Sequence, residues 1–403
     1  MELMPGYKMT EVGVIPEDWK DASLGELAEI RMCKRIFSEQ TNPTGDIPFF
    51  KIGTFGRAPD AFISGNLYRE YKRKYFFPKK GDVLLSAAGT LGKTVIYDGE
   101  DAYFQDSNIV WLDIDRTKIK NEYLYQCYQA IKWASPEGST ISRLYNGIIR
   151  KTKIPLPPTE TEQRAIAQAL SDVDALLATL DQVITKKRDL KQATMQQLLA
   201  GKTRLPGFSG EWEVKRLGEV IERIVGGGTP SRANNDYWNG STPWVTVKDF
   251  STFNTQQTQE YITDAGLKNS ASNLVPAGTL ITSTRMALGK AVIYHVDVTI
   301  NQDLKALFLK PNQDVQFMRY WFEQNSTMID SIGGGSTVKG ISIQQLQAFE
   351  FNSPPTKEEQ TAIACVLSNM DTELSALEAR RDKTRNIKQA MMQELLTGKT
   401  RLV

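Results

Sequence analysis

The sequence has few of the residues on which most enzyme active sites are built. It contains one histidine, His295, and three cysteines in 403 residues. Asp98 stands at the position of His295 in the other half of an internal duplication, so we expect His295 to be a structural or surface residue. The cysteines, Cys33, Cys127 and Cys365, have neither metal-ligand nor disulfide spacing, which is typical of reduced thiols in a cytoplasmic protein.

Long apolar runs and a strong charge bias are also missing. No run of 18 apolar residues is present, and the N-terminus lacks the apolar core of a signal peptide. We therefore expect a cytoplasmic protein with no membrane partner. The formal net charge of +2 argues against a general affinity for polyanions, so any nucleic-acid surface must be a local basic patch.

Two short patterns suggest catalysis, and both are weak. Residues 89–94 (GTLGKT) resemble a phosphate-binding loop, but Ala87 occupies the position where that loop needs its first glycine. Asp60, Glu70 and Lys72 fit the loose acid–acid–lysine pattern of Mg²⁺-dependent nucleases, yet the second half of the sequence has no equivalent. A nuclease stays an alternative, and the preferred interpretation is a non-catalytic chain without a cofactor of its own.

The sequence does contain a duplication. Residues 159–205 recur at 356–402, an offset of 197 at both ends, and about half of the aligned positions are identical. The match extends to the flanking segments, since residues 81–97 correspond to residues 278–294 at the same offset. A period near 200 residues is too long for a solenoid unit and indicates two copies of a whole module.

Each copy of the 159–205 segment predicts a long helix. It begins after a Pro-Pro pair with a capping box, at 159–162 and 356–359, and it ends at Gly201 or Gly398. Apolar residues follow at alternating spacings of four and three, which is the pattern of a coiled-coil seam. The predicted seam comprises Ile166, Leu170, Val173, Leu177, Leu180, Ile184, Ile363, Leu367, Met370, Leu374 and Leu377. We expect the two helices, each on the order of 60 Å long, to pair as an antiparallel coiled coil; the alternative is that each folds onto its own domain.

The rest of the chain predicts two globular domains of mixed α and β structure, which makes the fold class α+β. Apolar runs bounded by Gly and Asp predict paired strands around a turn, and helical stretches follow at 123–133 and 317–322. The predicted division is a first domain at 1–156, a long helix at 157–205, a second domain at 206–353 and a long helix at 354–403. Because the first module starts where a preceding helix would have ended, we expect the N-terminal arm to dock near the C-terminus.

Several local patterns suit DNA phosphates. Basic and aromatic residues alternate at 68–75, and Gly-rich loops at 226–232 and 333–339 carry a cation beside exposed backbone N–H groups. A solvated charged face or a hinge would have the same sequence. Lys93 and Lys290 rank highest because each follows a glycine at the same place in the duplicated hairpin, although a turn-capping role fits equally well. The candidate DNA contacts are Arg57, Lys72, Arg73, Lys74, Lys93, Arg143 and Arg150 in the first domain and Thr229, Arg232, Lys248, Arg285, Lys290 and Lys339 in the second.

The whole pattern resembles the specificity (S) subunit of type I restriction–modification systems. The motif EQ-x-AIA-x-x-LS-x-x-D occurs at 162–174 and 359–371, and each helical segment closes with LL-x-GKTRL. The segment at 226–249 (GGGTPSRANNDYWNGSTPWVTVKD) is typical of target-recognition domains in that family, whereas the first half departs from the GGTPS loop.

The resemblance implies a non-enzymatic scaffold. Each recognition domain would read one half of a bipartite site in double-stranded DNA, and the helices would set the gap and dock two adenine methyltransferase subunits. S-adenosylmethionine, ATP and Mg²⁺ would be bound by those partners and by restriction/translocase subunits. The rival class is a coiled-coil adaptor that binds proteins only.

Overall fold

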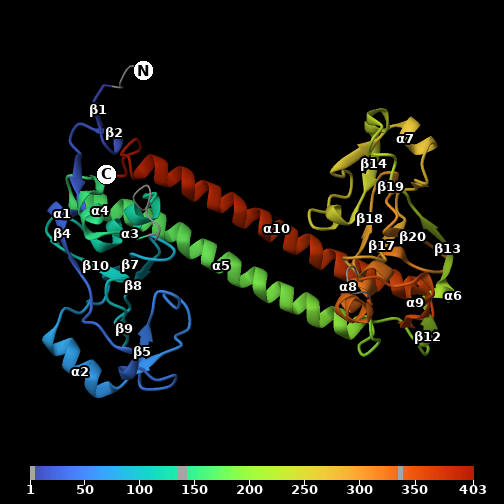
Figure 1. The fold of residues 1–403 in the computed structure, drawn as a ribbon, viewed down its shortest axis with the longest axis horizontal. Coiled ribbons are helices and arrows are strands. Elements are labelled where there is room, and N and C mark those ends of the chain that lie inside the picture. Colours follow the sequence, from blue (N-terminus) through green and yellow to red (C-terminus); the bar gives the residue numbers. More distant parts are fainter. Residues whose placement is uncertain (1–4, 134–142, 335–338) are drawn as a thin grey trace. The chain divides into compact units, whose positions relative to one another are not determined.

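Figure 1 shows the fold of the computed structural model, which describes residues 5–133, 143–334 and 339–403. The chain forms two compact units. Unit 1 comprises Met1–Asp181 and Arg380–Val403, and unit 2 comprises Gln182–Ala379. Each unit therefore contains one globular domain and one half of each long helix. The four-segment division predicted from the sequence keeps each helix whole and stays a prediction.

The two long helices have the predicted extent. Helix α5 spans Glu160–Leu198 and α10 spans Lys357–Leu395, so both are 39 residues long and start 197 residues apart. Each ends just before a glycine with φ of +69°, Gly201 or Gly398. Glycine adopts this left-handed conformation without steric strain, which is why it terminates both helices.

Ion pairs within each unit show that the helices run antiparallel. In unit 1, Lys388 lies 2.6 Å from Asp174, and Arg381 lies 3.7 Å from Asp181. In unit 2, Lys187 contacts Glu373 at 2.7 Å and Lys191 contacts Asp371 at 2.6 Å. Residue numbers in α10 fall as those in α5 rise, in agreement with the predicted pairing.

The predicted seam residues lie in two different environments. Ile166 and Leu170 are part of the first domain's core, and Ile363 and Leu367 are part of the second domain's core. Farther along the helices, Leu180, Ile184 and Leu374 are buried, while Val173, Leu177, Met370 and Leu377 are half-buried. The opening turns of each helix therefore complete a domain core, and that core also includes residues from the end of the other long helix, Leu395 in the first domain and Leu198 in the second. The assignment of all the predicted residues to one seam stays a prediction.

A four-stranded antiparallel sheet organises the first domain. Its strand order is β4-β10-β7-β8, with β4 at Ala28–Arg31, β10 at Ile109–Ile114, β7 at Val83–Ser86 and β8 at Thr94–Ile96. Side chains alternate between the two faces of a strand. Leu85 and Val110 accordingly belong to the core that includes α3 (Asn121–Ala130), α5 and α10, whereas Leu84 and Trp111 face a second core.

That second core lies under a small β lobe. The lobe contains β5 (Ile47–Phe50), β6 (Phe62–Ile63), β9 (Tyr103–Phe104) and the helix α2 (Gly65–Lys74). The remaining elements of unit 1 are the hairpin β1–β2 (Tyr7–Thr10, Gly13–Pro16), the pair β3–β11 (Lys20–Ser23, Lys153–Leu156), α1 (Leu24–Leu27), η1 (Ser38–Gln40) and α4 (Asn146–Lys151). Both faces of the main sheet are thus covered.

Unit 2 repeats this plan. Its main sheet has the order β13-β20-β17-β18, and its lobe sheet has the order β15-β14-β19-β16. The bounds are β13 Ile221–Gly226, β20 Leu304–Leu309, β17 Leu280–Ser283, β18 Ala291–Ile293, β15 Glu260–Ile262, β14 Trp238–Val245, β19 Val298–Ile300 and β16 Leu274–Val275. The other elements are β12 Glu213–Arg216, β21 Glu350–Ser353, α6 Leu217–Val220, α7 Asp264–Lys268, α8 Val315–Ile332, α9 Ile343–Ala348, η2 Asn235–Tyr237 and η3 Val247–Phe250.

Two predicted helix ranges need correction. Helix α3 begins two residues before the predicted 123 and ends at Ala130, and α8 continues ten residues beyond the predicted end at 322. The polar residues at 323–327 hide this continuation in the sequence, but Ile329 is fully buried and keeps the helix on its core. Among the described residues, no helix is long and apolar enough to cross a membrane.

The N-terminal arm docks against the C-terminal end of α10, as predicted. The Tyr7 hydroxyl donates a hydrogen bond to the carbonyl oxygen of Gly398 at 3.3 Å. Arg401 makes two hydrogen bonds of 3.1 Å to the carboxylate of Asp18. In unit 2 the backbone continues from the end of α5 into the second domain. At the corresponding place in unit 1, the N-terminal segment packs against the end of α10 through these hydrogen bonds.

The capping boxes form only in part. The Thr159 hydroxyl accepts the backbone N–H of Glu162 at 3.2 Å, and Thr356 accepts that of Glu359 at 3.3 Å. The carboxylates, which the pattern assigns to the caps, are bound by arginines: Glu162 by Arg401 and Glu359 by Arg204.

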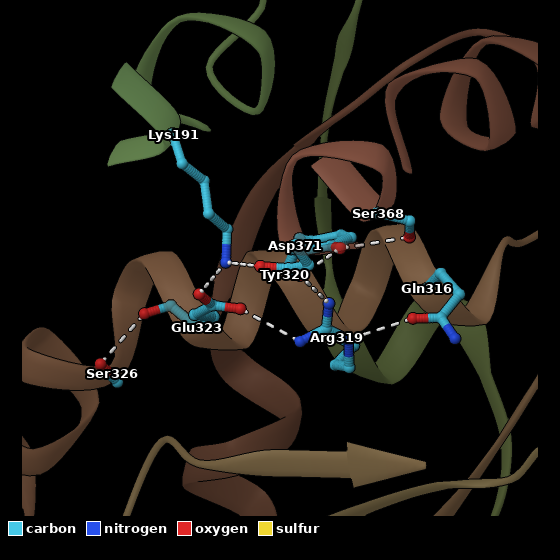
Figure 2. A network of polar contacts seen from close by, with 8 residues as sticks. All are labelled: Lys191, Gln316, Arg319, Tyr320, Glu323, Ser326, Ser368 and Asp371. Carbon is cyan, nitrogen blue, oxygen red and sulfur yellow. Dashed lines mark hydrogen bonds and ion pairs between the residues drawn. The ribbon is translucent and has the colours of Figure 1, made fainter. Parts of the chain in front are cut away.

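A polar network joins three helices of unit 2 (Figure 2). Lys191 of α5 lies 2.7 Å from Glu323 of α8 and 2.6 Å from Asp371 of α10. Asp371 also accepts hydrogen bonds from the Tyr320 hydroxyl at 2.6 Å and from Arg319 at 3.2 Å. Three cationic or hydroxyl donors thus surround one half-buried carboxylate and hold the two long helices to the domain.

Candidate nucleic-acid interface

The structure brings three of the predicted residues of the second domain together beside the β17–β18 turn. Arg285 forms an isolated β-bridge with Gly340, and the next residue donates its backbone N–H to the carbonyl of Lys339 at 3.0 Å. Arg285 also lies 3.7 Å from Asp303, and the neighbouring Gln302 accepts a hydrogen bond from Thr229 at 2.6 Å. The turn, the β19–β20 loop and the Gly-rich loop after β13 therefore meet at one edge.

The first domain has the same junction at the same offset. Ala88 forms a β-bridge with Arg143, which is the counterpart of the bridge between Arg285 and Gly340. The Arg143 guanidinium donates to the carbonyl of Ser107 at 2.9 Å, and Arg35 contacts Asp106 at 2.9 Å. Asp106 and Asp303 belong to two Gln-Asp pairs, at 105–106 and 302–303, that match in the sequence at the offset of 197. Each domain therefore has an arginine–aspartate pair at this edge.

Arg35 is a further candidate at this junction, and the sequence analysis missed it. Its side chain is 60% exposed and its guanidinium is held by Asp106, so it presents a cation at the junction. The duplicated Gln-Asp pair was the available signal. It did not identify Arg35, because the loop after β4 has diverged from the Gly-rich loop after β13.

Arg232 occupies a second position, on the lobe sheet of the second domain. Its guanidinium stacks on the Trp238 ring at 3.7 Å and forms an ion pair with Glu260. The hydrogen bond from Arg232 lowers the pKa of the Glu260 carboxyl, so the pair stays charged. Lys248, in η3, is exposed, and its charge also lowers the pKa of Glu260.

The duplicated lysines have different surroundings. Lys93 is half-buried, and its ammonium donates a hydrogen bond to the carbonyl of Phe55. Lys290 is exposed, and no ion pair or side-chain hydrogen bond links it to any described residue. The predicted equivalence therefore holds for the backbone position and not for the side chain. The Lys93 ammonium links its turn to the loop that carries Phe55, whereas Lys290 presents a cation to solvent.

The basic helix α2 is partly self-paired. Lys72 contacts the Tyr68 hydroxyl at 2.6 Å and Asp101 at 3.4 Å, and Lys74 contacts Glu70 at 2.8 Å. Arg73 is exposed and forms no side-chain hydrogen bond or ion pair with the described residues. The interleaved pattern at 68–75 therefore yields one unpaired cation rather than a continuous basic stripe.

The other candidates are spread over the two domains. Arg57 is exposed at the lobe and, within the described ranges, has no side-chain partner, while Arg150 contacts Glu29 at 3.1 Å. Lys339 contacts Asp330 at 2.9 Å, and residues 335–338 of its predicted Gly-rich loop lie outside the described residues. The assignment of these residues to DNA contact stays a prediction.

Exposed aromatic rings lie beside cations in the first domain. Arg31 stacks on Phe76 at 3.9 Å, and Lys34 lies 5.3 Å from the Tyr75 ring. Phe76 is 57% exposed and Tyr75 is 43% exposed. Rings of this kind can stack on bases or lie along a sugar–phosphate backbone, so they belong with the candidate interface.

The three residues of the nuclease alternative contact different partners. Asp60 pairs with Lys51 at 2.9 Å, Glu70 with Lys74, and Lys72 with Tyr68 and Asp101. The proposed acid–acid–lysine cluster therefore has three separate sets of partners. In residues 5–133, 143–334 and 339–403, no group of three His, Cys, Asp or Glu side chains is placed to hold a metal ion.

Comparisons with known proteins place this geometry in a family. The sequence model for the type I restriction modification DNA specificity domain matches residues 16–187 and 209–385. A protein of Methanocaldococcus jannaschii, assigned as the MjaX type I restriction enzyme specificity subunit, is 25% identical to this chain. The alignment covers 98% of this chain and 97% of the relative. The EcoR124I/EcoR124II specificity subunit of Escherichia coli is 28% identical over 70% of each chain. A protein assigned as a specificity subunit in Haemophilus influenzae is 56% identical over 153 residues, which span 38% of this chain and 40% of the relative.

Solved structures share the fold. The crystal structure of the type I restriction–modification S subunit from M. genitalium has a TM-score of 0.62 at 15% identity, and the alignment covers 98% of this chain and 99% of that one. A structure from work on complex assembly and conformational transition of the type I system has a TM-score of 0.56 at 18% identity, and it covers 96% and 99% of the two chains.

Proposed function

Because the chain belongs to the type I restriction–modification DNA specificity family, we propose that each of its two globular domains reads one half of a bipartite DNA site. As a member of that family the chain is a DNA sequence-recognition subunit. The observation that best supports DNA reading by both domains is the arginine–aspartate pair, which occurs at the edge of the main sheet in each of them. Asp106 and Asp303 occupy the same position in the two domains, and each pairs with an arginine, Arg35 from the loop after β4 and Arg285 from the β17–β18 turn.

An arginine held by a carboxylate is suited to base reading. A guanidinium can donate two hydrogen bonds to the O6 and N7 atoms of guanine, and an ion pair fixes its orientation before binding. The diverged loops around the two junctions would give the two halves of the site different sequences. Unpaired cations such as Arg73 and Lys290 would supply the phosphate contacts that position each domain.

The long helices would set the spacing of the half-sites. Two reading domains on a rigid connection bind with a high effective concentration, so two modest half-sites combine into one specific site. Deleting seven residues from both α5 and α10 shortens each helix by about 10 Å. We expect this deletion to shorten the preferred gap by about three base pairs and to leave both half-site sequences intact. A changed half-site with an unchanged gap would contradict the proposal.

The partners would dock on the helices. Leu190 of α5 and Ile387 of α10 occupy the same position in the repeat, and they are 52% and 47% exposed. Exposed aliphatic residues at equivalent positions suit two copies of one partner. We assign them to two adenine methyltransferase subunits, which would bind S-adenosylmethionine and carry the chemistry. Restriction/translocase subunits using ATP and Mg²⁺ would complete the assembly.

A selection from random duplex DNA tests the proposal directly. The chain is co-purified with the methyltransferase encoded beside it, and bound sequences are enriched over several rounds. We expect two short defined blocks separated by a constant number of undefined bases. Exchanging either domain for that of a relative should change one block only. A single contiguous block, or no enrichment, would favour the protein-only adaptor.

A further inference from the structure

The turn between β17 and β18 carries a methionine in a backbone conformation that methionine rarely adopts. Met286 has φ of +61°. The residue 197 positions earlier, in the corresponding turn of the first domain, is Gly89, with φ of +64°. The two turns thus share a left-handed residue, but only the first domain uses the amino acid that adopts this conformation without strain.

Packing within the chain does not explain the methionine. Met286 is 51% exposed, whereas Leu288, two residues later, is 3% exposed and belongs to the second domain's core. Leu288 therefore anchors the turn, and Met286 presents its side chain to solvent. Strained residues of this kind tend to occur at functional sites, where the conformation serves a contact outside the chain.

Hydrogen bonds hold the backbone of the turn, so the Cα and Cβ atoms of Met286 are presented in one position. The backbone N–H of Met286 donates to the Lys339 carbonyl at 3.0 Å, and Ile341 donates to the Thr284 carbonyl at 3.0 Å. The Thr282 hydroxyl bonds to the Lys290 carbonyl at 2.8 Å, which closes the base of the turn. The turn therefore fixes the point from which the side chain extends, and the flexible thioether chain can adapt to the surface that it contacts.

The residues around Met286 indicate the chemistry of the partner that its side chain would contact. Arg285, Lys290 and Lys339 flank it with exposed side chains. Arg285 and Lys339 also pair with Asp303 and Asp330, and among the described residues Lys290 is the cation of the three without a partner. An apolar tip among cations suits a DNA groove, in which phosphates line the edges and the thymine C5-methyl is the apolar group on the floor of the major groove. A protein partner would instead need carboxylates around an apolar pocket.

We infer that Met286 makes an apolar contact with the methyl group of a thymine in the half-site that the second domain reads. The inference rests on the proposed function and deepens it, because it names a specificity-determining residue and the base group that it reads. Gly89 cannot make this contact, so the first domain would read the equivalent position by other means.

Met286→Gly separates a structural role from a reading role. Glycine relieves the strained backbone and restores the residue of the other turn, so the variant should melt at the same temperature as the parent or higher. In complex with the methyltransferase, it should bind the selected site about tenfold more weakly, the usual effect of losing one base contact. Met286→Leu should retain most of the affinity. Met328→Ala, which removes another exposed methionine, from α8, serves as the control and should bind like the parent.

Uracil scanning identifies the methyl group. Each thymine of the half-site is replaced in turn by uracil, which lacks only the C5-methyl. We expect one replacement to weaken the parent complex and to leave Met286→Gly unaffected. Equal affinity of parent and Met286→Gly, or equal sensitivity of both to every uracil, would overturn the inference. So would impaired assembly with the methyltransferase at unchanged DNA affinity, because the contact would then be to protein. Absence of any sequence preference in the parent complex would instead overturn the proposed function itself.

Discussion

Arg401, two residues before the end of the chain, binds the buried carboxylate of Glu162 at the start of α5. Its Nη2 lies 2.9 Å from Oε2 of Glu162, whose side chain is 1% exposed. The same relationship recurs 197 residues away in unit 2, where Arg204 after the end of α5 binds Glu359 at the start of α10 with hydrogen bonds of 2.9 and 2.6 Å. Each helix end is thus fastened to the start of the other helix.

Removing Arg401 should destabilise unit 1 selectively. Arg401→Ala leaves a buried carboxylate without its cation, a change that costs about 3 kcal/mol in typical cases. We expect amide hydrogen exchange to accelerate in the first turns of α5 and at the N-terminal hairpin, and to stay unchanged in unit 2. Arg204→Ala is the matched control and should show the reverse pattern. Adding Glu162→Gln to Arg401→Ala should restore part of the protection, and failure to do so would contradict the charge-based explanation.

Asp371 should make the stability of unit 2 depend on pH in the acid range. Burial raises the pKa of its carboxyl, but the hydrogen bonds from Lys191 and Tyr320 and the charges of Lys191 and Arg319 outweigh this, and the pKa is lowered from its usual 3.8. A carboxyl with a lowered folded-state pKa contributes stability above its unfolded pKa and loses it as the pH falls through the folded value.

We therefore expect Asp371→Asn to lower the melting temperature of unit 2 at neutral pH, with a difference from the parent that shrinks below about pH 4. Thermal melts across this pH range provide the measurement. In a Lys191→Met background the difference should be smaller and less dependent on pH. A difference that stays constant from neutral pH to pH 2 would show that the charge of Asp371 is irrelevant.

The regular parts of the fold could be predicted from the sequence because their causes are local. The Pro-Pro pairs, the four-and-three spacing and the terminal glycines specify both helices to within a few residues. From the duplication we could predict that the helices pair antiparallel and that the N-terminal arm docks near the C-terminus. The long-range contacts could not be predicted in the same way. Glu162 and Glu359 match the capping-box pattern, yet their carboxylates bind arginines that lie far along the chain.

The candidate interface shows the same limit. Lys93 and Lys290 are equivalent in sequence, but the carbonyl of Phe55 holds Lys93, and Lys290 has no such contact with the described residues. The strain at Met286 is inferred from its positive φ angle, and φ angles cannot be read from a sequence pattern. The substitution of methionine for Gly89 in the aligned turns was the available signal, and it acquires meaning only once both turns are known to be left-handed.

The equivalent exposed positions on the helices should control partner assembly. Leu190→Asp with Ile387→Asp places charges on residues that contribute little to the core, so the melting temperature should change little. We expect the double variant to lose both methyltransferase subunits and each single variant to lose one, as measured by light scattering of the purified complex. Gln192→Asp with Gln389→Asp, at exposed positions with the same offset, is the matched control. Intact complexes of the Leu190 and Ile387 variants would place the docking surface elsewhere.

Lys290 and Lys93 allow a paired test of phosphate contact. Lys290 is exposed and unpaired among the described residues, so we expect Lys290→Ala to weaken DNA binding and to reduce the salt dependence of the affinity by about one ion. Lys93 holds the Phe55 carbonyl, so Lys93→Ala should lower the melting temperature of unit 1 and leave the salt slope nearly unchanged. Affinities measured from about 50 to 200 mM salt separate the two effects, because the slope counts released counterions and is insensitive to folding stability. A reduced slope for Lys93→Ala would mean that its ammonium leaves the carbonyl when DNA binds. An unchanged slope for Lys290→Ala would remove Lys290 from the interface.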